Sequence, residues 1–359
     1  MKSGNPSYSF VLAVTISWLF VTTAFAQEDS DRTSELERLK LAGKPVSVND
    51  LNVEPIPDVD NAAWWFSQAE AGRKATESAL GEDFNSDQDF SEKLVEKFEA
   101  INTAETFQKI SKAISANAYV PLVELDSSNF DSINAKDRVE MRSFARLLYF
   151  RGAVEIAKGQ PHEAAKTALQ IIKLSRQPNH YLGLVGFLVR KAIQNMGASL
   201  LIEAMETGAI HEPALLNRLQ AELSALDNLN DLVQTIDSER VFGLYLLKSQ
   251  GPLTLLWNTE PYLKTMRLAQ QQLALPIAEH HELFDGEGTG GILTNQLLPA
   301  LKMTRQAAHR ELTTLRQLRI QIAFLQQPEA ETVESLELPP ATKTDPSTGQ
   351  ILTVTPADN

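Results

Sequence analysis

The sequence predicts an all-α protein, folded as an irregular multi-helix bundle or a short array of helical hairpins. Apolar residues recur at three- and four-residue spacing through most of the chain, as they do on one face of an α-helix. Capping residues, prolines and glycines stand where these stretches begin and end. The short alternation of apolar and polar residues that predicts a sheet is missing until Ile351.

Composition divides the 359 residues into four regions. Residues 1–26 are predominantly apolar, and residues 27–60 form an acidic N-terminal segment. Residues 61–327 are predicted to be the helical domain, because 43% of the chain is hydrophobic and helical periodicity is strongest there. Residues 328–359 are a Pro-, Glu- and Thr-rich tail with an Asp-Pro turn.

The first 26 residues are typical of a secretory signal peptide. Lys2 precedes an apolar stretch from Phe10 to Val21, and Ala24 and Ala26 provide the small residues of a cleavage site. An uncleaved membrane anchor is the alternative, since Tyr8 to Ala26 approaches the length of a spanning helix. The acidic residues that follow favour cleavage. We therefore expect an exported protein, periplasmic or secreted, with no membrane span after cleavage.

The net charge limits the classes of partner to expect, and the cysteine content limits the covalent modifications. The formal net charge is −13, or −14 once Lys2 is removed with the signal segment. An acidic surface disfavours nucleic acid and anionic lipid, so we expect protein partners in the cell envelope. The chain has no cysteine, which excludes disulfides and lipidated cysteines. Packing alone must stabilise the fold.

The helices are predicted in order from periodicity and from their caps. Asp58 to Asn61 supplies capping residues before the first long helix, and residues 117–134 are expected to be irregular. The helix over 181–206 is apolar on most sides and is predicted to be the core helix. The predicted ranges are 34–41, 61–80, 91–100, 103–116, 138–158, 161–177, 181–206, 213–226, 229–248, 261–284 (kinked at Pro276) and 297–325.

The C-terminal tail is predicted to be mobile over residues 328–344. Asp345 to Gln350 is expected to form a turn, and residues 351–354 a short terminal strand.

Part of the chain resembles a single tetratricopeptide-type hairpin. Gly152, Gly159 and Ala164 stand where that repeat places its small residues, within Leu148 to Ile171. No second copy follows at a period of about 34 residues, so we interpret the match as a packing motif. We expect Gly152 to lie where the two helices of this hairpin touch.

A wider resemblance covers most of the region after the signal segment. Its landmarks are Ala42-Gly43-Lys44-Pro45-Val46 with Asp50-Leu51, Asn61-Ala62-Ala63, the hairpin Arg146–Arg176 and the turn Asp345–Gln350. In this order the chain resembles a group of exported helical proteins from planctomycete-type bacteria. In that group a Gly-x-x-Pro segment precedes the Asp-Pro turn, whereas residues 327–340 replace it here. The resemblance implies export and helical architecture, and no catalytic residue.

Two segments carry candidate metal ligands. Oxygen ligands alternate at Asp83, Asn85, Asp87 and Asp89, a pattern that can bind calcium, the one cofactor we consider. The loop lacks the usual glycine and closing glutamate, and a solvated turn with a helix cap is the alternative. His281 and Asp285 are spaced to share a helical face and a transition metal, with a solvated helix end as the alternative.

No catalytic motif is recognisable, so the catalytic residues are unknown. The sequence has no Gly-x-Ser-x-Gly elbow, no cysteine nucleophile and no dinucleotide fingerprint. Trp64-Trp65-Phe66 is interpreted as core packing, with a ligand groove as the alternative.

We expect a non-catalytic scaffold or partner-binding protein of the periplasm or cell envelope. The alternative is an exported hydrolase or lyase with carboxylate acid/base residues in a helical cleft.

Cleavage after Ala26 is directly testable. Because Ala24 and Ala26 fit the small pockets of signal peptidase, we expect the mature protein to begin at Gln27. Intact mass measured on extracytoplasmic protein checks this. A membrane-bound species that retains residues 1–26 would identify the segment as an anchor.

The calcium hypothesis predicts a weak, specific effect on stability. With no closing glutamate we expect a Kd on the order of 10⁻⁴–10⁻³ M. At tenfold excess, calcium should then stabilise the fold by about 1.4 kcal/mol. Thermal unfolding is compared with calcium and with chelator at matched ionic strength, for the wild type and for Asp83→Asn/Asp87→Asn. Equal responses in the two proteins would assign the effect to charge screening.

Overall fold

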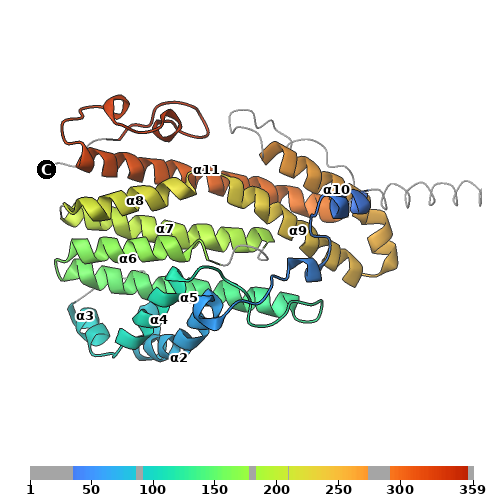
Figure 1. Ribbon diagram of the computed structural model, residues 1–359, viewed down its shortest axis with the longest axis horizontal. Coiled ribbons are helices and arrows are strands. Elements are labelled where there is room, and N and C mark those ends of the chain that lie inside the picture. Colours follow the sequence, from blue (N-terminus) through green and yellow to red (C-terminus); the bar gives the residue numbers. More distant parts are fainter. Residues whose placement is uncertain (1–34, 86–91, 178–182, 209, 274–291, 355–359) are drawn as a thin grey trace, which may run out of the picture.

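The described part of the chain is almost entirely helical (Figure 1). The computed structural model describes residues 35–85, 92–177, 183–208, 210–273 and 292–354. Within them the only β-type pairings are isolated bridges, Asn61 with Ala118 and Thr344 with Ile351. The prediction of an all-α multi-helix bundle is confirmed. The α-helices are α2 (Ala62–Leu80), α3 (Glu92–Glu99), α4 (Ala104–Ser115), α5 (Phe130–Ala157), α6 (Pro161–Leu174), α7 (Gly183–Thr207), α8 (Pro213–Leu226), α9 (Asn230–Ser249), α10 (Pro252–Leu273) and α11 (Ile292–Gln326).

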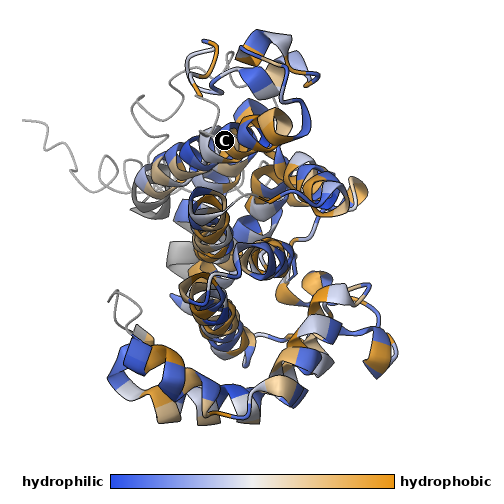
Figure 2. Cartoon of the chain, turned by 90° about the vertical axis from the view of Figure 1, so that its left-hand side faces the viewer, coloured by the Kyte–Doolittle hydropathy of each residue, from blue (hydrophilic) through white to orange (hydrophobic). Residues whose placement is uncertain are grey.

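The helices stack in layers. α2, α3 and α4 form one outer layer, α5 and α6 the next, and α7 and α8 separate these from α11 (Figure 1). α9 and α10 extend the bundle at one end of α11. Viewed along the helices, the α2–α4 layer and the C-terminal tail lie at opposite ends of the stack (Figure 2). Within the described residues, no helix combines the length and apolar character needed to cross a membrane.

α7 is the core helix that the sequence predicts. It packs against α5, α6, α9 and α11. Gly197 allows α6 to approach α7 closely. A Cβ on Gly197 would lie 2.8 Å from Cγ1 of Ile172 and 3.1 Å from the carbonyl oxygen of Ala168. Such a distance leaves no room for a side chain, so α6 and α7 meet almost backbone to backbone.

Gly152 has its closest contact with a third helix. A Cβ at this position would stand 2.3 Å from Cδ2 of Leu200 on α7, whereas we expected α6 to be its neighbour. α5 packs against both α6 and α7, and Gly152 is on the side that faces α7. A hairpin motif read from sequence cannot identify this third helix.

Helix starts follow the predicted capping residues in most cases. The Asn61 side chain accepts a hydrogen bond from the backbone N–H of Ala63 at 3.0 Å, and α6 and α8 begin at Pro161 and Pro213. α10 begins at Pro252 rather than at the predicted Pro261, which lies inside the helix. The predicted kink at Pro276 lies outside the described residues.

α5 also begins earlier than predicted, at Phe130 instead of residue 138. The polar residues that suggested an irregular segment form a turn directly before the helix: the Asp126 carboxylate accepts hydrogen bonds from the backbone N–H groups of Ser128 and Asn129. Phe130 is buried, with its ring 6.0 Å from that of Phe242 on α9. A long-range contact therefore extends the helix through a locally polar sequence.

The N-terminal segment is folded onto α9. Residues 35–41 are helical, and the 3₁₀-helix η1 (Val48–Leu51) buries both of its terminal side chains. Lys44 forms an ion pair of 2.8 Å with Asp237, and Arg240 donates to the carbonyl oxygen of Pro45 at 3.0 Å. Basic and acidic groups thus hold the described part of this segment, residues 35–60, against the bundle.

The predicted mobile tail is instead packed, which corrects our expectation. Val333 in η5 (Val333–Ser335), Leu336 and Leu352 are buried against Ile320 and Phe324 of α11. Polar composition suggested mobility, but a few spaced apolar residues are enough to cover the exposed face of α11. The predicted strand at 351–354 is reduced to one bridge, between Ile351 and Thr344 across the Asp345 turn.

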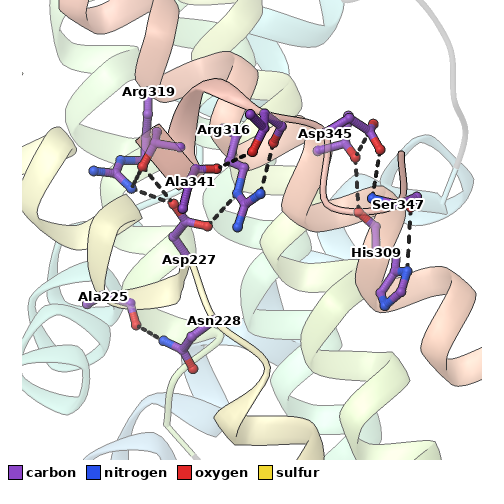
Figure 3. Close-up of polar contacts among 12 residues, drawn as sticks. Ala225, Asp227, Asn228, His309, Arg316, Arg319, Ala341, Asp345 and Ser347 are labelled. Carbon is purple, nitrogen blue, oxygen red and sulfur yellow. Dashed lines mark hydrogen bonds and ion pairs between the residues drawn. The ribbon is translucent and has the colours of Figure 1, made fainter. Parts of the chain in front are cut away.

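One buried carboxylate joins the tail to the bundle (Figure 3). Asp227, at the end of α8, receives Arg316 Nε at 2.7 Å and Arg319 Nη1 at 2.6 Å, both from α11. Arg319 also donates to the Thr342 hydroxyl in η6 (Pro340–Lys343), and Arg316 to the carbonyl oxygen of Thr344. Asp227 thereby links α8, α11 and the tail.

The contact at Gly152 generates a stability prediction. Gly152→Leu should lower the free energy of unfolding by about 1–3 kcal/mol, because the new side chain overlaps Leu200. Chemical denaturation measures this, and Leu200→Ala supplies a double-mutant cycle. The double variant should lose less unfolding free energy than the sum of the losses in the two single variants. Full additivity would contradict the contact.

Candidate binding groove

Two irregular segments, 52–61 and 118–125, are joined side by side by asparagine side chains. The Asn52 amide donates to the carbonyl oxygen of Leu125 at 2.9 Å and accepts from its backbone N–H at 2.8 Å. Asn61 makes the same pair of bonds with Val120, at 2.9 Å and 3.1 Å. Each carboxamide bonds both the backbone N–H and the carbonyl oxygen of one residue on the other segment. Segments without regular structure are thereby held in a defined position.

The joined segments expose apolar side chains. Exposed fractions are 46% for Val53, 66% for Val59, 53% for Leu122 and 58% for Val123. Single exposed apolar residues are common on protein surfaces, but several on two adjoining segments mark an interaction site. The loop backbones are held by Asn52 and Asn61, so this apolar surface is present before any partner binds.

Two open cavities adjoin at these segments. One, of about 390 Å³, is lined by residues of both segments, including Asp58 and Glu124. The other, of about 380 Å³, reaches the ends of α4 and α6 and Glu222 of α8. The cavities share Val53 and Val120. We call this continuous surface the binding groove; its lining residues are Asn52, Val53, Pro55, Ile56, Asp58, Asn61, Ile114, residues 116–124, Lys173, Arg176, Gln177 and Glu222.

The two ends of the binding groove differ in charge. At the α6 end, Lys173 Nζ lies 2.9 Å from one oxygen of Glu222, and Arg176 Nη1 lies 2.8 Å from the other. One carboxylate shared by two cations leaves this end with an excess positive charge. At the opposite end, Asp58 and Glu124 carry negative charge. The groove therefore combines exposed apolar side chains with cations lining one cavity and carboxylates lining the other.

Trp65 supports the groove from behind. Its indole Nε1 donates to the carbonyl oxygen of Val59 at 2.9 Å, and the Lys112 ammonium lies 4.3 Å from its ring centroid. Phe66 is buried, with its ring 5.0 Å from that of Phe144 on α5. The predicted core packing of the aromatic triplet holds for Phe66, while Trp65 positions the 52–61 segment.

Acids with raised pKa values lie elsewhere. Burial raises the pKa of Glu311 on α11 to about 7, against the opposing effect of the Lys191 ammonium 3.0 Å away. Burial also raises the pKa of Glu239 on α9, which accepts a hydrogen bond from the backbone N–H of Leu184. Neither carboxyl lines the binding groove. They are not placed to exchange a proton with a ligand there.

Most of the predicted metal ligands cannot be placed. Asp87, Asp89, His281 and Asp285 lie outside the described residues. Asp83 and Asn85 belong to η3 (Gly81–Asn85), and the Asp83 carboxylate accepts a hydrogen bond from Lys97 Nζ at 2.7 Å. In the part of the chain that the structure describes, no three His, Asp or Glu side chains converge on a metal position. The calcium loop stays a prediction.

No pattern in the sequence indicates the binding groove. Its apolar residues lie among Pro, Asp and Ser, in segments interpreted only as irregular. Hydrophobic residues in such a setting are the one available signal, because no periodic face of a helix or strand accounts for their presence. The pairing of 52–61 with 118–125 connects positions about sixty residues apart, and no local pattern indicates it.

Comparisons with models of protein families, with curated proteins and with solved structures find no match for this chain. Fold and groove together define an all-α protein with an open groove that exposes apolar side chains.

Proposed function

We propose that this is an exported, non-catalytic protein whose binding groove holds an extended apolar segment of a partner protein in the cell envelope. The exposed apolar surface on the paired segments 52–61 and 118–125 carries the proposal. Covering Val53, Leu122 and Val123, which line the groove, removes apolar area from water, and this stabilises the complex by about 25 cal/mol per Å². The pattern of residues 1–26 supports the exported location.

Preorganisation favours binding at this surface. The asparagine bonds fix both segments, so a partner does not need to order them when it binds. Both cavities are open, which suits an extended chain that crosses the surface. An open surface with exposed apolar side chains and charged groups is the anatomy of a protein interface.

Charge orients the bound segment. An acidic residue of the partner belongs near Lys173 and Arg176, and a basic residue near Asp58 and Glu124. Contact at the wrong end would place like charges together, which selects one direction of binding. The alternative of a hydrolase or lyase is less well supported, since Glu222 in the groove is held by two cations.

A peptide binding assay tests the proposal. The probe is a labelled nonapeptide with Val and Leu between one terminal Asp and one terminal Lys, and fluorescence anisotropy gives its Kd. Leu122→Ser/Val123→Ser should weaken binding by about tenfold or more, since two apolar contacts are lost. Both side chains are exposed, so the melting temperature should change little.

Val139→Ser is the matched control, because Val139 is 65% exposed on α5, outside the groove. It should bind like the wild type. Equal affinity in the wild type and the double variant would overturn the assignment of the groove. So would an equal loss in Val139→Ser.

A further inference from the structure

A second groove lies on another face of the α2–α6 end of the bundle. Its volume is about 500 Å³, and it is bordered by α4, α5 and α6. Gln108, Ser111 and Lys112 line it from α4, where their spacing puts them on one side of the helix. Arg151 of α5 and Gln170 of α6 complete its polar lining. We call this surface the polar groove.

The polar groove is positively charged in an acidic protein. Lys112 and Arg151 line it, and no Asp or Glu does, whereas the whole chain carries a net charge of −13. Arg151 is paired with Glu155 at 2.8 Å, so Lys112 supplies the excess positive charge that attracts an anion locally against the overall charge. Lys112 has no carboxylate partner among the described residues; its ammonium lies over the Trp65 ring.

Arg151 is held in position for a ligand. Its Nε donates to one oxygen of Glu155 at 2.8 Å, and the other oxygen of Glu155 accepts from the Thr167 hydroxyl at 2.7 Å. The guanidinium carbon lies 5.0 Å from the ring centroid of Phe107. One side of the guanidinium is thereby anchored, and its two terminal nitrogens remain to bind an oxyanion in a bidentate manner.

Uncharged polar groups accompany the cations. The side chains of Gln108, Ser111 and Gln170 hydrogen-bond to no other residue in the described part of the chain, and all three face the same groove. Two carboxamides and a hydroxyl supply both hydrogen-bond donors and acceptors. A ligand that bears hydroxyl groups as well as negative charge matches this set.

We propose that the polar groove binds an acidic saccharide. Its carboxylate or sulfate would pair with Arg151 and Lys112, and its hydroxyls would bond to Gln108, Ser111 and Gln170. The groove has the volume of a typical small-molecule site, which accommodates a disaccharide. This inference is independent of the binding groove for partner segments, since the two surfaces share no lining residue.

Titration calorimetry of the full chain tests the proposal, with digalacturonate, a sulfated disaccharide, neutral cellobiose and tetraglutamate as probes. At low salt we expect saturable binding of one of the acidic sugars, with Kd on the order of 1 mM and weakening with salt. Trp65 fluorescence should change in parallel, because Lys112 lies over its ring. Cellobiose and tetraglutamate should bind at least about tenfold more weakly.

Variants distinguish the site from general charge attraction. Lys112→Gln should weaken binding of the acidic sugar by about tenfold. Lys109→Gln is the matched control, since it removes the same charge from α4 but outside the groove, where Lys109 pairs with Glu105. Gln108→Ala should weaken sugar binding without a change in net charge.

Three results would overturn the proposal. One is the absence of saturable binding of either acidic sugar up to about 10 mM. Another is an equal loss in Lys112→Gln and Lys109→Gln, which would reveal unspecific attraction. Tetraglutamate binding as tightly as the sugars would show that hydroxyl recognition is absent.

Discussion

The arrangement of this protein depends on the burial of α7. Its sequence is apolar on most sides, so it is stable in water only when helices surround it. α5, α6, α9 and α11 supply that cover, and Gly152 and Gly197 allow two of them to approach closely. The other layers are attached to these four helices. The α2–α4 layer and the ends of α6 and α8, which form the binding groove, take their positions from this packing.

Polar contacts join the elements that the apolar core does not reach. Asp227 is buried with Arg316 and Arg319, and removal of one partner from such a buried pair costs about 3–5 kcal/mol. This interaction gives the tail a defined position on α11, although its composition is that of a mobile segment. Asn52 and Asn61 do the same for the groove. Each carboxamide bonds the backbone N–H and carbonyl oxygen of one residue, as a neighbouring strand would in a sheet. In both places a few specific bonds order a chain that has little regular structure.

The two proposed binding surfaces use the same scaffold in different ways. α4 contributes Ile114 and Ala116 at its C-terminal end to the binding groove, and Gln108 and Lys112 to the polar groove. One surface offers apolar side chains on fixed loops, the other charged and amide groups on helices. A protein that holds an envelope partner at one surface and an acidic glycan at the other would act as a connector. Neither activity needs a proton-transfer group, and Glu239 and Glu311, whose pKa values are raised by burial, lie in the interior.

The sequence by itself determined the fold class, most helix ranges and the identity of the core helix. These are local properties, because they depend only on residues close together in the chain. The periodicity of apolar residues indicates them, and so do the helix starts at Asn61, Pro161 and Pro213. Only the tertiary structure decided the early start of α5 at Phe130, the partner of Gly152 and the packing of the tail. It also decided both candidate sites. Each of these depends on residues far apart in the chain, and a contact across such a separation leaves no periodic pattern in the sequence.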